Sequence, residues 1–91
     1  MAALFTLGEI KIKPRAALLL ENTRTNPASL LLRHVTGDWG EVGNDQRRVN
    51  DEAVREGGRI LSAYGEGKKR IWVMTEADRS ITTILSGDEA L

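Results

Sequence analysis

Hydrophobic and polar residues alternate along two stretches near the C-terminal end of the chain, residues 70–76 and 81–85. In the first stretch, Ile71 and Val73 point to one side while Trp72 points to the other. β-branched residues dominate both stretches, as the half-buried surface of a sheet favours. The short charged segment between them predicts a tight turn, so the two stretches form a hairpin.

Two further stretches alternate in the same way. Residues 4–13 alternate around Ile10-Lys11-Ile12-Lys13, which indicates a strand at the edge of a sheet. Residues 59–64 predict another strand, and the loop 65–69 has the length of a hairpin connection. The last three strands therefore predict an antiparallel meander. The pattern does not determine where the first strand joins the sheet.

Helical spacing replaces alternation between residues 14 and 56. Pro14 suits the first turn of a short helix that continues to about Glu21. Asn26-Pro27 begins a second helix, which Gly37 ends. The spacing of i, i+3, i+4 and i+7 predicts that its apolar face carries Ala28, Leu31, Leu32 and Val35.

A third helix follows a glycine-rich loop that spans residues 37–43. Asn44-Asp45 can cap this helix, which continues to about Glu56. The helix is very polar and is expected to lie on the surface. Its narrow inward stripe would consist of Val49, Ala53 and Val54.

The predicted order is thus β-α-α-α-β-β-β, with the helices covering one face of the sheet. This is an α+β, two-layer fold with a C-terminal three-stranded antiparallel meander. We expect a single domain over residues 1–91, with a tail at residues 87–91 that frays.

Composition excludes several classes of protein. The chain has no cysteine and a single histidine, which excludes disulfides, thiol catalysis and a multi-histidine zinc site within one chain. Thirteen basic and thirteen acidic residues cancel, so nucleic acid is not an expected partner, while weak charge repulsion allows a homodimer. The first eight residues lack the features of a signal peptide, and no apolar run is long enough to span a membrane. We therefore expect a cytoplasmic protein.

Candidate chemistry begins at the end of the second helix. Asp38 could orient His34, as an acid orients an imidazole in many sites; alternatively, His34 is partly buried and caps the helix. Trp39 lies between glycines, where its ring could be a stacking platform in a pocket, or could pack in the core.

The turn of the last hairpin holds the second group of candidates. Glu76 and Asp78 could together bind a divalent cation, and Arg79 could neutralise them or bind an anion. The alternative is a charged turn that keeps the hairpin soluble. Tyr64, at the end of the preceding strand, could join these residues and those around His34 in one cleft.

Three segments of the chain also resemble a known family. They are His34-Val-Thr-Gly-Asp-Trp-Gly40, the stretch from Asn50 through Glu56-Gly-Gly-Arg-Ile-Leu-Ser-Ala-Tyr64, and residues 71–85 with their Thr-Glu-Ala-Asp-Arg-Ser motif. Together they are similar to small uncharacterised proteins of bacterial plasmids and integrative elements, often labelled plasmid-related or type I restriction endonuclease. The family tends to end in Leu-Pro-x-Glu-Tyr, where this chain has Ser86-Gly-Asp-Glu-Ala90. Ninety-one residues cannot hold a methyltransferase, a translocase and a nuclease, so the resemblance implies an accessory protein of a mobile element and carries over no catalytic residue.

The leading expectation is a non-enzymatic protein-interaction module that acts on a host defence or maintenance system through a partner of unknown identity. We expect no cofactor and no metal. The first alternative is a small enzyme or ligand-binding protein with a polar cleft. A second alternative is a nucleic-acid binder. The candidate binding residues are His34, Asp38, Trp39, Tyr64, Glu76, Asp78 and Arg79.

Overall fold

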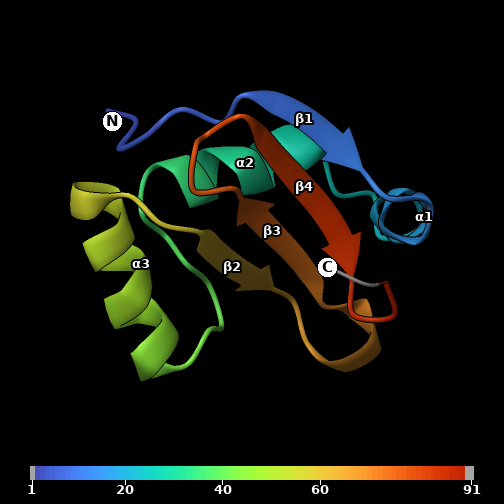
Figure 1. Cartoon of the computed structure of the whole chain (residues 1–91). Coiled ribbons are helices and arrows are strands. Elements are labelled where there is room, and N and C mark those ends of the chain that lie inside the picture. Colours follow the sequence, from blue (N-terminus) through green and yellow to red (C-terminus); the bar gives the residue numbers. More distant parts are fainter. Residues whose placement is uncertain (1, 90–91) are drawn as a thin grey trace.

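The chain forms one four-stranded sheet packed with three α-helices, as a computed structural model of residues 2–89 shows (Figure 1). In chain order, the elements are β1 (Glu9–Ile12), α1 (Pro14–Asn22), α2 (Pro27–Val35), α3 (Asn44–Glu56), β2 (Ile60–Tyr64), the short 3-10 helix η1 (Gly67–Lys69), β3 (Ile71–Thr75) and β4 (Ile81–Ser86). The predicted α+β class and element order are confirmed.

The sheet has the strand order β1-β4-β3-β2. The last three strands form the predicted antiparallel meander. β1 adds to the outside of β4 in the parallel direction, with Glu9 beside Ile81 and Ile12 beside Ile84, so the complete sheet is mixed. The intervening helices and strands supply the long connection that a parallel neighbour requires.

One face of the sheet is covered by α1 and α2. The register places Ser62, Val73 and Ile84 in one row across β2, β3 and β4, and this row faces the two helices. The hydrophobic core on this side consists of Ala16, Leu20, Leu30, Tyr64, Ile71, Val73 and Ile84.

The predicted apolar face of α2 was partly wrong in its rotation about the helix axis, although Leu31 packs against the core as predicted. Leu32, assigned to that face, is 58% exposed, whereas Leu30 and His34 are buried. The polar side chain His34 decides the orientation, because it hydrogen-bonds two strands of the sheet. Apolar periodicity alone does not contain that information.

The outer edge of β2 is closed by the glycine-rich loop. The Ala63 amide donates to the Trp39 carbonyl at 3.1 Å, and the Glu41 amide donates to the Ala63 carbonyl at 2.7 Å. Between them, Gly40 adopts φ +72°, and a Cβ there would overlap the Ala63 carbonyl. The loop therefore needs glycine at this position in order to lie against the strand.

α3 also covers the outer edge of β2, through the buried side-chain amide of Asn50. Asn50 Nδ2 donates to the Leu61 carbonyl at 2.8 Å, and Asn50 Oδ1 accepts from the Leu61 amide at 3.1 Å. The side chain thus pairs with the strand edge as a neighbouring strand would. Asn50 and Ala53 are the buried residues of the helix, while Val49 is 51% exposed, so the predicted inward stripe was partly wrong. The helix lies beside β2 rather than over the face that α1 and α2 cover (Figure 1).

The start of the predicted fraying tail contacts α1. The Glu89 carboxylate accepts from the amides of Arg15 and Ala16 at 3.0 and 3.1 Å, and from the Ser86 amide at 2.8 Å. These bonds satisfy free N–H groups in the first turn of α1, where no side-chain cap comes from its own N-cap residue. Residues 90–91 lie outside the part of the chain that the structure describes.

Candidate functional site

His34 is fully buried beneath α2 and reaches the sheet with both ring nitrogens. Nδ1 lies 2.6 Å from the Ser62 hydroxyl, and Nε2 lies 2.9 Å from the Thr75 hydroxyl. The Thr75 and Thr82 hydroxyls are 2.7 Å apart, and Thr82 donates to the Leu7 carbonyl at 2.7 Å. One chain of hydrogen bonds therefore crosses β2, β3 and β4.

The carbonyl at the end of this chain determines the direction of every hydrogen bond in it, because a carbonyl can only accept. Thr82 uses its hydrogen for Leu7, so Thr75 must donate to Thr82. Thr75 has no second hydrogen, so His34 Nε2 carries the ring proton and donates to Thr75. Nδ1 then accepts from Ser62, and the ring is the neutral Nε2–H tautomer.

Burial, with a smaller effect from the positive charge of Arg79, lowers the pKa of His34 to about 4. The rings of Phe5 and Trp39 pack edge-on to the imidazole, with centroids 5.3 and 6.0 Å away. The contact between Ser62 and His34 has the composition of a nucleophile–base pair. Both side chains are fully buried, however, so this pair is part of the core.

Asp38 does not orient His34. Its carboxylate accepts from Arg33 Nε at 2.7 Å and from the Gly40 amide at 3.1 Å, and the Arg33 hydrogen bond is the main cause that lowers the pKa of Asp38. The Asp38 carbonyl accepts from the Tyr64 hydroxyl at 2.7 Å. Burial raises the pKa of Tyr64 to about 12, so its phenol stays neutral and anchors the loop.

Trp39 packs inside the molecule and offers no free ring face as a stacking platform. Its indole N–H donates to the Asp51 carboxylate of α3 at 3.0 Å. Its ring stacks on Phe5, with centroids 6.3 Å apart and an interplanar angle of 26°. Trp39 thus joins the loop, α3 and the N-terminal segment.

Arg79 fastens the β3–β4 turn to the end of α3. It adopts φ +63°, a backbone conformation that is uncommon for residues other than glycine. Nη1 donates to the Gly58 carbonyl at 2.6 Å, and Nη2 donates to the Ala53 carbonyl at 2.8 Å. The guanidinium lies 5.4 Å from the centre of the Phe5 ring. Its donors are therefore directed at the protein's own backbone.

The two turn acids have separate contacts. Asp78 accepts from the Ser80 hydroxyl at 2.6 Å and from the Ser80 amide at 3.0 Å, which closes the turn and lowers the pKa of Asp78. Glu76 lies 3.5 Å from Arg59. Residues 2–89 contain no group of three or more side chains placed to hold a metal ion, so these acids lack a third acidic or histidine ligand there.

The seven predicted residues thus do not meet in one cleft. His34, Trp39 and Tyr64 are buried in the core, and Arg79 binds backbone carbonyls. Asp38 and Asp78 lie at the surface and stabilise their own loops. Glu76 alone among the seven lines the groove formed by β1, β3 and β4.

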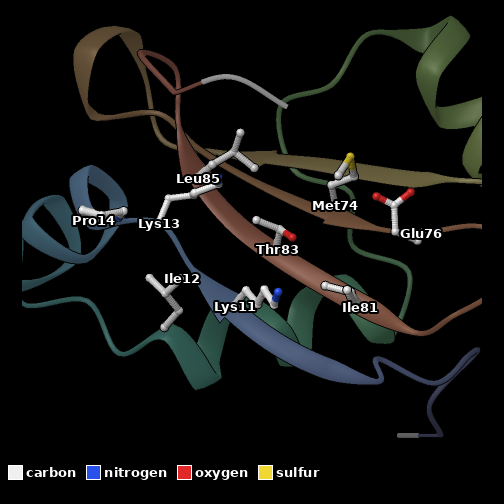
Figure 2. A pocket seen from close by; sticks show the side chains of 9 residues that line it. All are labelled: Lys11, Ile12, Lys13, Pro14, Met74, Glu76, Ile81, Thr83 and Leu85. Atoms are coloured by element: carbon white, nitrogen blue, oxygen red, sulfur yellow. The ribbon is translucent and has the colours of Figure 1, made fainter.

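That groove lies on the sheet face opposite α1 and α2 and has a volume of about 490 Å³ (Figure 2). The register places Lys11, Thr83 and Met74 in one row across β1, β4 and β3. Met74 and the neighbouring Leu85 are buried in its floor. The complete lining consists of Lys11, Ile12, Lys13, Pro14, Met74, Glu76, Ile81, Thr83 and Leu85.

The rim of the groove is positively charged. Within residues 2–89, neither Lys11 nor Lys13 forms an ion pair. The acid in the lining, Glu76, lies beside Arg59 instead. The groove therefore combines an apolar floor with two lysines whose charges are not neutralised by a neighbouring acid.

Sequence reasoning missed this groove, although alternation already placed Met74 with Glu76, and Ile81 with Thr83, on common faces. The sequence pattern did not predict the position of β1 in the sheet. Only the parallel pairing of β1 with β4 brings Lys11 next to these side chains.

Comparison of the chain with protein-family models, curated proteins and solved structures found no match. In the part of the chain that the structure describes, no helix is long and apolar enough to cross a bilayer. These comparisons therefore add no support to any function.

Proposed function

We propose that this protein is a non-enzymatic protein-interaction module and that its binding surface is the groove on β1, β4 and β3. The observation that carries the proposal is a groove with apolar and polar lining on a sheet face that no helix within residues 2–89 covers (Figure 1). A face that only meets water normally carries polar residues. Here Met74, Ile81 and Leu85 form a floor inside a charged rim, the arrangement that protein interfaces use.

The scaffold under the groove favours recognition by a preformed surface. The groove residues stand on three hydrogen-bonded strands. The opposite face of those strands is packed against α1 and α2 and tied by the hydrogen bonds of His34. Side chains held in this way lose little freedom when a partner binds.

The alternatives have less support. An enzyme built on His34 would need an accessible imidazole, whereas both of its ring nitrogens are hydrogen-bonded inside the core. A nucleic-acid surface would need a concentrated positive field. The groove offers only Lys11 and Lys13 in a chain of zero net charge, and its floor is apolar.

The class of partner follows from the resemblance of residues 33–85 to small proteins of plasmids and integrative elements. On that basis we propose a mobile-element accessory protein that acts in the cytoplasm on a host protein of a defence or maintenance system. The groove chemistry adds that the partner's contact segment is apolar with acidic neighbours, because acidic groups would pair with Lys11 at the rim.

Site-specific photo-crosslinking in bacterial cells that express the protein tests the proposal. A photoreactive amino acid replaces Thr83 in the groove, or Glu52 on the exposed side of α3 as a matched control. We expect a discrete crosslinked protein from position 83 and none from position 52. Adding Lys11→Glu and Lys13→Glu should remove the crosslink. Equal labelling from both positions, or none from position 83, would contradict the proposed surface.

A further inference from the structure

The outer edge of β1 has unpaired backbone groups. The amides of Glu9 and Lys13 donate at 2.9 Å to carbonyls on the β4 side. Successive residues of a strand turn their N–H and C=O groups to opposite sides, so those of Ile10 and Ile12 point away from the sheet. No hydrogen bond within residues 2–89 satisfies them.

The same two residues expose apolar side chains. Ile10 is 38% exposed and Ile12 is 41% exposed. Their register with Thr82 and Ile84 places them on the face that α1 and α2 cover, away from the lysines of the groove. Unpaired backbone groups beside exposed isoleucines form an edge that favours the addition of another strand.

We propose that β1 pairs with β1 of a second copy of the chain, antiparallel about a two-fold axis. This inference goes beyond the proposed function and does not depend on it. In the dimer, Ile10 lies opposite Ile12 of the partner subunit, and each such pair exchanges two backbone hydrogen bonds. The pairing also brings the four isoleucines together on the helix side of a continuous sheet.

The backbone selects this register over its neighbours. Moving the axis to Ile10 would place Ile12 opposite a glycine, Gly8, whose φ of +66° leaves the extended conformation. Moving it to Ile12 would place Ile10 opposite Pro14, which has no N–H and begins α1. Only the axis at Lys11 pairs both isoleucines with extended residues.

The charges agree with the same register. With the axis at Lys11, Glu9 lies opposite Lys13 of the partner subunit on both sides of the axis. Neither residue forms an ion pair within the described part of the chain. The two Lys11 side chains meet near the axis. Their long stems let the charged groups move apart, but the remaining repulsion limits the affinity of the dimer. Two four-residue strands form a small contact, so we expect a weak dimer that forms only at high protein concentration.

A charge swap tests the proposal by sedimentation equilibrium at protein concentrations from about 5 µM to about 1 mM. Lys13→Glu places acid against acid twice and should weaken the dimer by roughly tenfold. Glu9→Lys should weaken it similarly by placing lysine against lysine. The double variant Glu9→Lys with Lys13→Glu restores opposite charges and should recover the wild-type dissociation constant.

Leu32→Ser is the matched control, because it removes an exposed apolar side chain from α2 and should leave the dimer unchanged. Circular dichroism verifies that each variant is folded. A wild-type chain that stays monomeric over the whole range would overturn the proposal. So would a dimer that both single variants leave intact, or one that the double variant fails to restore.

Discussion

The two edges of the sheet have opposite surroundings. At the β2 edge, the loop around Gly40 and the side-chain amide of Asn50 hydrogen-bond the outward-pointing backbone groups of Leu61 and Ala63. At the β1 edge, the corresponding groups of Ile10 and Ile12 have no partner within residues 2–89, and the groove lies on the adjoining face.

The difference shows what closing a sheet edge requires. β2 is closed by a glycine with positive φ, a buried amide and an arginine that fixes the end of α3. Within residues 2–89, no loop or side chain hydrogen-bonds the outer edge of β1, a four-residue strand whose residues are all exposed. We therefore interpret the β2 side as structural and the β1 side as the side that meets other molecules.

The largest effect is expected where the closed edge is broken. Asn50→Leu leaves the Leu61 N–H and C=O groups without their partner, which should lower the free energy of unfolding by about 4 kcal/mol. Chemical denaturation measures the loss. The neighbouring exposed Val49→Ala should change stability by less than about 0.5 kcal/mol. A loss under about 1 kcal/mol in Asn50→Leu would mean that the loop alone closes the edge.

Protonation of the buried histidine should lower the free energy of unfolding by about 3 kcal/mol as the pH falls. The pKa of His34 is about 4 in the folded protein, whereas an unperturbed histidine, as in the unfolded chain, has a pKa of 6.5. Between these values the unfolded chain binds more protons, so stability is complete above about pH 6.5 and falls as the pH drops toward 4. Denaturation midpoints at several pH values measure this slope.

His34→Gln provides the control for that measurement, because the amide does not titrate. The slope between pH 6.5 and about 4.5 should become distinctly shallower in this variant, whatever its absolute stability. Parallel slopes in the two proteins would show that His34 is not the group that titrates.

A smaller effect is expected at the turn that fixes α3. Arg79→Lys should lower the free energy of unfolding by about 1.5 kcal/mol, because an ammonium cannot bridge the Gly58 and Ala53 carbonyls as a guanidinium does. Arg59→Lys, in a surface ion pair with Glu76, should cost less than about 0.5 kcal/mol. Thermal denaturation compares the two. Crosslinking from position 83 should persist in Arg79→Lys, and its loss there would place Arg79 in the binding surface.

The smallest effect on stability is expected on the open side. Replacing Ile10 and Ile12 together with threonine keeps β-branched residues on the strand and should change the free energy of unfolding of the monomer by less than about 1 kcal/mol. The dimer should nevertheless weaken more than tenfold, as sedimentation would show, because the isoleucine cluster is lost. A dimer of unchanged affinity would exclude these side chains from the contact.

Local patterns predicted most of the fold. Alternation identified the strands from residue 59 onward, and the Asn26-Pro27 start of α2 matches the observed cap, in which the Asn26 side chain accepts from the Ala28 amide. The parallel position of β1 was not predictable, because the alternation of four residues carries no information on its neighbour. The rotation of α2 was missed because a histidine faces the sheet beside Leu30.

The candidate site was predicted less well than the fold. Trp39, Tyr64 and Arg79 were predicted as candidate binding residues because of their chemistry. In the structure, their hydrogen bonds to Asp51, Asp38 and Gly58 connect loops to neighbouring elements. The groove is lined instead by ordinary strand residues such as Lys11 and Thr83. They become neighbours only through the pairing of strands about 70 residues apart in the sequence.

Amide hydrogen exchange measured by NMR tests the contrast between the two edges most directly. In dilute protein, the amides of Leu61 and Ala63 should exchange slowly while those of Ile10 and Ile12 exchange fast, with the inward-facing Lys11 amide as the reference for a folded β1. As the concentration rises through the range of the dimer, Ile10 and Ile12 should become protected and the other amides should not change. Fast exchange of Ile10 and Ile12 at every concentration, or protection that is already complete in the monomer, would contradict a free edge that pairs with a second copy.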